Sequence, residues 1–318
     1  MTTIVTGGAG FIGSHLVERL AARGGEVIVV DNFDPFYDRQ LKERNLSKAL
    51  RFPRVRLYEE DIRNGEAMRD LLARHRPDVI VHLAARAGVR PSIDNPALYT
   101  EVNVLGTVRL LEAACRLEPL PRFVYASSSS VYGDRAGGPF RETDPVDHPV
   151  SPYAATKRAC ELMAHTFHHL YGLPVTGLRF FTAYGPRNRP DLAIARFVQL
   201  IDRDEPVPMY GDGSSRRDYT YITDLVEGIE RAIDHCCKEH LYNLGNSNPI
   251  SLATMIDTIG RVLGKDPVIH RLPEQPGDVR QTYADITRAS RELGYQPVTP
   301  FREGIERYIA WIRDHEGG

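Results

Sequence analysis

The 318-residue chain has little cysteine, a single tryptophan and almost no net charge. Its four cysteines, Cys115, Cys160, Cys236 and Cys237, lack the spacing of metal ligands, so we expect free thiols and no bound metal. The formal net charge of −2 gives no general attraction to nucleic acid or membrane surfaces. No apolar run is long enough to span a membrane, and no basic leader segment opens the chain. These absences favour a globular protein of the reducing cytoplasm.

Internal repeats and low-complexity tails are also absent. This rules out repeat architectures and long disordered extensions. A chain of 318 residues is at the upper end of what one hydrophobic core supports. We therefore expect one domain with an added lobe, or two domains.

The first thirty residues carry the pattern on which the rest depends. An apolar strand leads into a glycine-rich turn, a helix and a second strand that ends in a carboxylate. The turn fits both G-x-G-x-x-G and G-x-x-G-x-x-G, which let a pyrophosphate approach the backbone at a helix N-terminus. A carboxylate at the second strand's end accepts hydrogen bonds from both ribose hydroxyls and repels a 2′-phosphate. We predict a site for NAD rather than NADP, built on Gly7, Gly8, Gly10, Gly13 and Asp31.

Strand-like and helix-like segments then alternate as far as residue 181. This alternation predicts an α/β fold with a Rossmann-type, doubly wound parallel sheet. Asp61 ends one of these strands near the expected adenine, and Ala84 and Ala85 are small enough for the backbone to lie against a cofactor. The predicted strands are 55–62, 78–85, 122–126 and 175–181, and the predicted helices are 67–75, 95–116 and 152–171.

The alternation breaks after residue 181, which indicates a second, smaller α/β lobe for the substrate. We expect residues 1–176 to form the NAD-binding domain, with segments near 218–245 returning to it. Residues 177–318 should form mainly the substrate lobe, and residues 182–191 should be a loop within it.

A serine run and a tyrosine–lysine pair supply candidate catalytic groups. The serines, residues 127–130, directly follow a buried strand, and ligands bind at the carboxyl ends of strands in such sheets. Tyr153 and Lys157 are four residues apart on one helix face, so both can point at one site. A lysine ammonium stabilises a phenolate, and a serine hydroxyl on the same substrate oxygen can share the proton. The pattern favours acid–base catalysis over an ordinary helix with a core tyrosine and an exposed lysine.

With these motifs in place, the sequence resembles the extended short-chain dehydrogenases/reductases of the sugar-nucleotide epimerase and dehydratase group. The resemblance covers nearly the whole chain. It implies that Ser128, Tyr153 and Lys157 are catalytic and that a homodimer forms through helices 95–116 and 153–171. It rests on TGGAGFIG (6–13), HLAA (82–85), NVLGT (103–107), SSSSVYG (127–133), YAATK (153–157) and RDYTYI (217–222).

The same resemblance extends the list of binding residues. It implies an NAD site that also includes Lys157 and Tyr153 and a UDP-sugar site in which arginines hold the diphosphate. Further NAD contacts are expected from Phe11, Ile12, Asn32, Asp61, Ile62, Leu83, Ala84, Ala85 and Asn103. Substrate contacts are expected from Arg90, Ser127, Ser128, Ser129, Thr182, Arg189, Arg217, Asp278 and Arg280.

The residues after the catalytic serine distinguish the members of this group. Dehydratases and UDP-glucuronate decarboxylases carry an acidic residue there, whereas this chain has Ser129 and Ser130. Residues 31–38, 87–90 and 179–191 resemble UDP-glucuronate 4-epimerases. We therefore expect NAD-dependent epimerisation of UDP-glucuronate to UDP-galacturonate through a transient 4-keto sugar. The alternatives are a UDP-glucose or UDP-N-acetylglucosamine 4-epimerase, a UDP-glucuronate decarboxylase, and a non-catalytic NAD-binding protein.

Two residues depart from the epimerase pattern. Ala183 stands where valine is usual, and Arg86 stands where these relatives often have glutamine. Arg86 has two readings of equal weight: it adds positive charge near the site, or it points outward as a surface residue.

Overall fold

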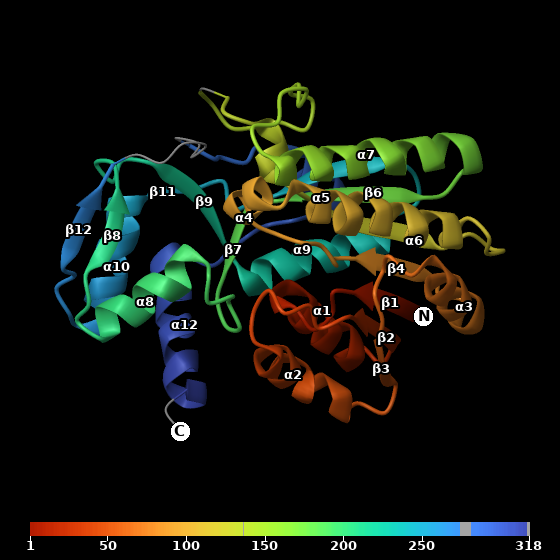
Figure 1. The fold of residues 1–318 in the computed structure, drawn as a ribbon, viewed down its shortest axis with the longest axis horizontal. Helices are drawn as coiled ribbons and strands as arrows, with labels where there is room; N and C mark the ends of the chain where they lie inside the picture. Colours follow the sequence, from red (N-terminus) through yellow and green to blue (C-terminus); the bar gives the residue numbers. More distant parts are fainter. Residues whose placement is uncertain (136, 274–280, 317–318) are drawn as a thin grey trace. The chain divides into compact units, whose positions relative to one another are not determined.

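The computed structural model describes residues 1–135, 137–273 and 281–316. The chain divides into two compact units, and Figure 1 traces it from end to end. The first unit contains residues 1–133, 145–179 and 226–242, and the second contains residues 134–144, 180–225 and 243–318. The expected boundary after 176 lies close to the observed one after 179. Residues 218–225, expected with the first domain, lie in the second unit, as do residues 134–144.

A seven-stranded sheet organises the first unit. Its strand order is β10-β6-β5-β4-β1-β2-β3, and the pairings from β3 to β5 are all parallel. The order 3-2-1-4-5-6 is that of a Rossmann sheet, so the predicted fold class is confirmed. The strands are β1 (Thr2–Thr6), β2 (Glu26–Asp31), β3 (Val55–Glu59), β4 (Val79–His82), β5 (Arg122–Ser128), β6 (Val175–Phe180) and β10 (His240–Leu244).

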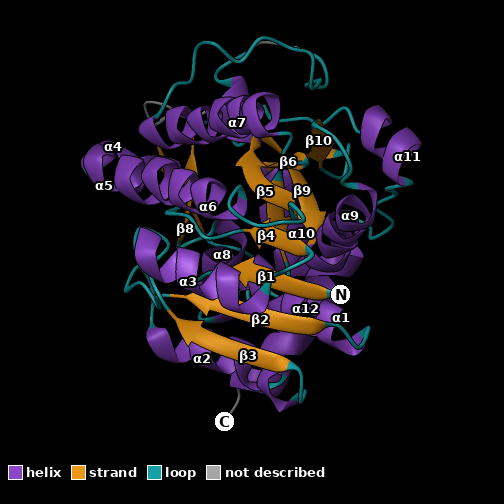
Figure 2. Ribbon diagram, turned by 90° about the vertical axis from the view of Figure 1, so that its right-hand side faces the viewer, coloured by secondary structure: helices purple, strands orange, loops and turns teal. Residues whose placement is uncertain are grey.

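Helices cover both faces of this sheet, as Figure 2 shows. One face carries α3 (Gly65–His75), α6 (Gly106–Ala114) and α7 (Pro152–Tyr171). The other carries α1 (Phe11–Ala22) and α9 (Ile222–His235), and α2 (Arg39–Ser47) packs against α1.

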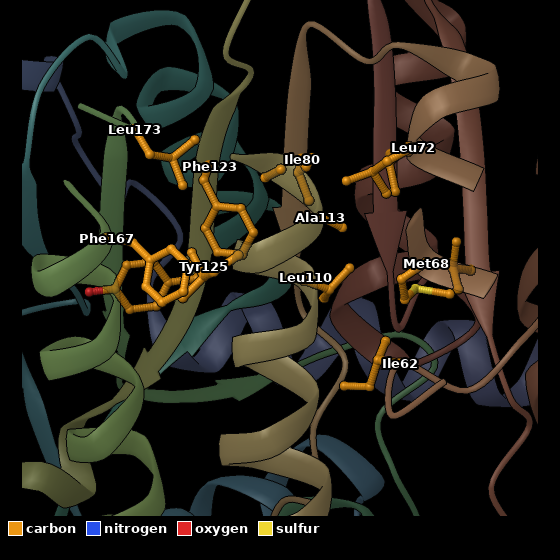
Figure 3. Packing of buried hydrophobic residues seen from close by; sticks show 14 of the residues in the cluster. Ile62, Met68, Leu72, Ile80, Leu110, Ala113, Phe123, Tyr125, Phe167 and Leu173 are labelled. Carbon is orange, nitrogen blue, oxygen red and sulfur yellow. The ribbon is translucent and has the colours of Figure 1, made fainter. Parts of the chain in front are cut away.

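The core between the sheet and the first helix layer is apolar (Figure 3). Ile80 of β4, Phe123 of β5 and Leu110 of α6 are fully buried there. Burying one such side chain contributes roughly 1.5–3 kcal/mol, so this layer fixes β4 and β5 against the helices. The carboxyl ends of these strands carry the candidate site.

The predicted helix 95–116 is present as an unbroken helical run over residues 96–114, but this run is not α-helical throughout. It consists of α5 (Pro96–Tyr99), the π-helical η2 (Thr100–Leu105) and α6, and α4 (Val89–Asp94) precedes it. A π turn adds one residue to a helical turn and is often found at functional sites. Here it contains the buried Asn103, whose amide bonds to the loop after β4.

The described residues of the second unit form two small sheets and four helices. The three-stranded sheet is ordered β11-β9-β7 and the two-stranded sheet β12-β8. The expected loop 182–191 begins with strand β7, which pairs in parallel with β9 and corrects that expectation. The strands are β7 (Thr182–Tyr184), β8 (Val207–Tyr210), β9 (Arg216–Tyr221), β11 (Pro249–Ser251) and β12 (Ile269–Leu272), and the helices are α8 (Ala193–Asp202), α10 (Leu252–Leu263), α11 (Thr287–Leu293) and α12 (Phe301–Glu316).

An aromatic cluster stabilises the second unit. Tyr184 of β7 contacts Tyr219 and Tyr221 of β9, with ring centroids 6.3 and 5.6 Å away. Phe301, the first residue of α12, lies 5.3 Å from the Tyr184 ring. These rings therefore join β7 and β9 to the last helix.

Among residues 1–135, 137–273 and 281–316, no helix is both long enough and apolar enough to cross a membrane.

Candidate active site

The turn after β1 has space only for glycine at two of its predicted positions. Gly7 has φ +69°, and a Cβ there would lie 2.6 Å from the backbone nitrogen of Ala84. A Cβ on Gly13 would lie 2.2 Å from the carbonyl oxygen of Gly7. The close-packed turn leads directly into α1, whose N-cap residue Gly10 has no side chain to cap the helix. The first N–H groups of α1 are thus available to an anion such as pyrophosphate.

Asp31 is fixed beside this turn. Its Oδ2 accepts a hydrogen bond of 3.0 Å from the Ala9 amide, and its Oδ1 accepts one of 2.9 Å from the Phe33 amide. Sequence reasoning missed a buried cation next to it: the Nζ of Lys42, on α2, lies 3.7 Å from Asp31 Oδ1. The arrangement holds a charged carboxylate at the end of β2, where a ribose diol can reach it.

Asp61 and Asn32, both predicted cofactor residues, lie together. The Asn32 side-chain amide donates to Asp61 Oδ2 over 2.9 Å. Arg63 also donates to both carboxylate oxygens, at 3.0 and 2.8 Å. The hydrogen bond from Arg63 holds the pKa of Asp61 below its ordinary value, so the carboxyl is ionised at neutral pH. The predicted contact of Asp61 with the adenine amino group stays a prediction.

Hydrogen bonds from buried side chains hold the end of β4 and the loop that follows it. His82 is buried and lies 2.7 Å from Thr6 Oγ1 and 2.9 Å from Thr107 Oγ1. Burial lowers the pKa of His82 to about 3, so its imidazole is neutral at physiological pH. Asn103 then binds the backbone of Arg86 through both amide atoms, at 2.8 and 3.0 Å. The predicted residues Leu83, Ala84 and Ala85 therefore lie on a rigid segment beside the glycine turn.

The serine run spans the end of β5 and a short 3₁₀ helix, η3 (Ser129–Tyr132). The strand is longer than predicted and includes Ser127 and Ser128. Ser128 caps η3, since its Oγ accepts a 3.2 Å hydrogen bond from the Ser130 amide. Ser127 has a different partner, because its hydroxyl donates to Glu161 Oε1 over 2.6 Å. The hydroxyl of Ser127 is thus used inside the protein, whereas Ser128 is buried at 8% exposure and Ser129, the next residue, is half-buried.

Glu161 is the centre of a buried ion-pair network that the sequence prediction did not include. Arg179 of β6 donates to both of its oxygens, at 2.8 and 2.9 Å, and Arg158 donates to Oε2 at 3.0 Å. The Arg179 guanidinium also lies 4.7 Å from the centre of the Tyr132 ring. Burial favours a higher pKa for Glu161, but the pair with Arg179 and the Ser127 hydrogen bond hold this pKa below its ordinary value. The helical spacing 153, 157, 161 was the available signal, because it places Glu161 on the face of the catalytic pair.

Helix α7 brings the tyrosine–lysine pair to the end of β5. Ser151 caps the helix by accepting a 3.1 Å hydrogen bond from the Ala154 amide, and Pro152 occupies its first turn. Lys157 is 5% exposed and its Nζ donates to the carbonyl of Ala126 over 2.8 Å. The backbone amide of Tyr153 donates to Ser92 Oγ over 3.1 Å. A half-buried phenol, a buried ammonium and a strand-end hydroxyl can together take a proton from a substrate hydroxyl.

Three predicted substrate residues of the second unit are described, and they lie on its three-stranded sheet and the loop after β7. Thr182 is the first residue of β7 and pairs with Tyr219 of β9. Arg217 lies on β9 and is half-buried, and Arg189 pairs with Asp191 at 2.6 Å. Asp278 and Arg280 lie outside the described residues. Arg90, in the first unit, is exposed on α4.

A buried carboxylate organises the chain around Arg217. Asp218 accepts hydrogen bonds from the backbone amides of Asn246, Ser247 and Ala284, at 2.8, 3.0 and 3.0 Å. Burial raises the pKa of this carboxyl, against the effect of these amides. Asp218 thereby fixes two loops beside the arginine, a role that the motif alone did not reveal.

Comparisons with known proteins agree with this geometry. The family model described as GDP-mannose 4,6 dehydratase matches residues 4–308. The UDP-glucuronate 4-epimerase of Thermodesulfobacterium geofontis (strain OPF15) is 38% identical, over 98% of this chain and 96% of that protein. The structure of UDP-glucuronic acid 4-epimerase from Bacillus cereus, in complex with UDP-glucuronic acid and NAD, matches with TM-score 0.93 and 35% identity and covers 99% of both chains.

A dehydratase also matches well. The dTDP-glucose 4,6-dehydratase DesIV from Streptomyces venezuelae, with NAD and TYD bound, has TM-score 0.93 and 33% identity, and the match covers 100% of this chain and 98% of that one. The backbone is therefore similar to that of structures named as epimerases and of a structure named as a dehydratase. By the match over residues 4–308, the chain belongs to the GDP-mannose 4,6 dehydratase family, within the extended short-chain dehydrogenases/reductases that its motifs predicted.

Proposed function

We propose that the protein is a UDP-glucuronate 4-epimerase, which converts UDP-glucuronate to UDP-galacturonate with bound NAD. The observation that carries this choice is the chemistry at the end of β5. Residues 127–130 offer only hydroxyls, and the nearby carboxylate, Glu161, is buried and bonded to Arg179, Arg158 and Ser127. Elimination of water needs an acid and a base aimed at the sugar, whereas 4-epimerisation needs only a proton acceptor and a hydride carrier.

The residues of the first unit fit NAD. The glycine turn leaves room for a pyrophosphate where a Cβ would clash, and the first amides of α1 face it. Asp31 suits a ribose diol and disfavours a 2′-phosphate. In this proposal Gly7, Gly10, Phe11, Ile12, Gly13, Asp31, Asn32, Asp61, Ile62, Leu83, Ala84, Ala85, Asn103, Tyr153 and Lys157 hold the cofactor.

Three side chains carry the acid–base chemistry in this proposal. The Tyr153 phenolate accepts the proton of the sugar O4 hydroxyl, and Ser128 Oγ hydrogen-bonds to the same oxygen. Lys157 stabilises the phenolate, and its bond to the Ala126 carbonyl fixes the ammonium at the end of β5. When bound, NAD would supply reversible hydride transfer at C4, the redox chemistry that these side chains lack. Tyr153 then returns the proton to O4, so the reaction leaves no net oxidation.

Inversion requires the 4-keto sugar to present its other face before the hydride returns. Contacts to the nucleotide rather than the sugar permit this rotation, because they hold the substrate while the sugar turns about its diphosphate link. Arginine forks suit this purpose, since each guanidinium binds phosphate oxygens through two N–H groups. We assign this nucleotide-holding role to Arg90, Arg189, Arg217, Asp278 and Arg280.

Neutral donors are suited to the carboxylate of the hexuronate. Thr182 and the serines Ser127 to Ser129 are predicted substrate contacts that could supply such donors. The Ser127 hydroxyl is already bonded to Glu161 and Ser128 is assigned to O4, so Thr182 and Ser129 remain for the carboxylate. Hydroxyls bind the anion without withdrawing electrons from it. Such binding favours a 4-keto intermediate that keeps its carboxylate over one that loses CO2. This distinguishes the proposed epimerase from a decarboxylase.

The experiment that tests this function is an NMR time course of purified protein with UDP-glucuronate and no added cofactor. We expect UDP-galacturonate to accumulate to a constant ratio with UDP-glucuronate. Release of CO2 with a UDP-pentose would assign the protein as a decarboxylase. Turnover of UDP-glucose or UDP-N-acetylglucosamine alone would keep the mechanism and exclude the role of Thr182 in carboxylate binding.

We further propose that the protein is a cytoplasmic homodimer that associates through α6 and α7. Leu162 and Leu170 of α7 are exposed in the single chain, at 50% and 61%, which favours burial against a second copy.

Leu162→Glu should therefore convert the dimer to a monomer, measured by light scattering after gel filtration. Leu50→Glu, at an exposed leucine outside α6 and α7, is the matched control and should remain dimeric. A monomeric wild type, or a dimeric Leu162→Glu variant, would contradict this interface.

A further inference from the structure

Arg86 departs from the epimerase pattern and does not point outward. Its side chain is 20% exposed, and its Nη2 lies 3.3 Å from Oδ2 of Asp34. The guanidinium carbon lies 5.4 Å from the centre of the Phe36 ring. Its Nε is buried and has no hydrogen-bond partner in the part of the chain that the structure describes. The cation is thus positioned by two residues of another loop, and its Nε–H group makes no hydrogen bond to the described residues.

The two partners come from loops on opposite sides of the glycine turn. Arg86 follows β4, whereas Asp34 and Phe36 follow β2. In the sheet, β1 lies between β4 and β2, and all three strands are parallel. The ion pair therefore crosses the carboxyl end of β1, where the glycine turn begins and where a dinucleotide lies in this fold.

The backbone on both sides is held without this ion pair. The Asn103 amide fixes the backbone of Arg86, at 2.8 and 3.0 Å. On the other side, the amide of Asp34 donates to Asn32 Oδ1 at 3.0 Å. Since neither loop needs the Arg86 side chain for its conformation, the side chain is available for a role toward a ligand.

We propose that Arg86, positioned by Asp34 and Phe36, closes over bound NAD and slows its release. This inference rests on the proposed function, since it assumes that NAD occupies the first unit. An epimerase that returns the hydride to its own substrate must keep the same NAD from one turnover to the next. Arg86 retains the cofactor and takes no part in proton transfer, and Asp34 acts only by positioning Arg86.

The test measures the dissociation rate of NAD itself. Purified protein is loaded with radiolabelled NAD, chased with excess unlabelled NAD and sampled by rapid filtration. Arg86→Gln, which introduces the residue of many relatives, should release NAD about tenfold faster, equivalent to ~1.4 kcal/mol. Arg23→Gln is the matched control: it removes ion pairs with Asp234 and Glu230, at 3.2 and 3.5 Å, and should release NAD at the wild-type rate.

Asp34→Asn separates this mechanism from a direct role of Asp34. If Asp34 acts by positioning Arg86, Asp34→Asn should accelerate NAD release in the wild-type background and have no effect in the Arg86→Gln background. An equal effect in both backgrounds would overturn the inference, as would an Arg86→Gln rate within twofold of wild type. In either case NAD bound to the wild type would leave the proposed function intact. A wild type that binds no labelled NAD would overturn both.

Discussion

Tyr153→Phe should reduce turnover of UDP-glucuronate by about 10²–10⁴-fold, the usual contribution of a positioned general base. The variant keeps the ring, which packs edge-on against Tyr99 with centroids 6.3 Å apart, and loses only the hydroxyl. The Lys157 bond to the Ala126 carbonyl and the glycine turn are unchanged, so NAD should stay bound. Initial rates by NMR and the NAD content of the purified variant measure the two effects separately.

Tyr171→Phe is the matched control, since this tyrosine ends the same helix and is exposed. Its rate should equal that of the wild type. A Tyr153→Phe variant with full activity would refute the assignment of Tyr153 as the base. Loss of NAD together with activity would show that the residue acts mainly in cofactor binding.

Glu161→Gln should lower the free energy of unfolding by about 3–5 kcal/mol, because it leaves the Arg179 cation buried without its counter-charge. Arg179 is 1% exposed, so water cannot replace the lost partner. The stabilisation by Glu161 follows from its depressed folded-state pKa, so it is present above the unfolded-state pKa of about 4.3. The free energy of unfolding should differ between wild type and variant at pH 7, and this difference should become smaller as the pH falls through the folded-state pKa of Glu161.

Denaturant unfolding at a fixed NAD concentration measures this difference. Glu227→Gln is the control, because Glu227 pairs with Arg231 on the surface of α9 at 2.7 Å and both side chains are well exposed. An exposed pair of this kind contributes about 0.5 kcal/mol or less. Equal unfolding free energies for Glu161→Gln and the control would show that the buried network does not stabilise the first unit.

The sequence predicts those parts of the site whose residues lie close together along the chain. The glycine turn, Asp31 and the Tyr153–Lys157 pair are local patterns whose geometry follows from one strand, one turn or one helix. Alternating segments sufficed for the Rossmann sheet because right-handed crossovers leave few topologies for such a chain.

The remaining features depend on tertiary contacts. Lys42 reaches Asp31 only because α2 folds back on α1, and Arg179 reaches Glu161 from a strand eighteen positions further along the chain. The π turn around Asn103 adds a residue that no apolar periodicity records. The sequence alone left open whether Arg86 points toward the site or outward, because its partner Asp34 is distant in sequence.

The most direct test of the mechanism uses UDP-glucuronate deuterated at C4, with no added cofactor. If the hydride passes to bound NAD and returns to the same sugar, the deuterium should remain on C4 of UDP-galacturonate and none should appear in water. Mass spectrometry of the product and ²H NMR of the solvent measure both quantities. Loss of deuterium to water during epimerisation would contradict transient oxidation at C4, and with it the central claim of this account.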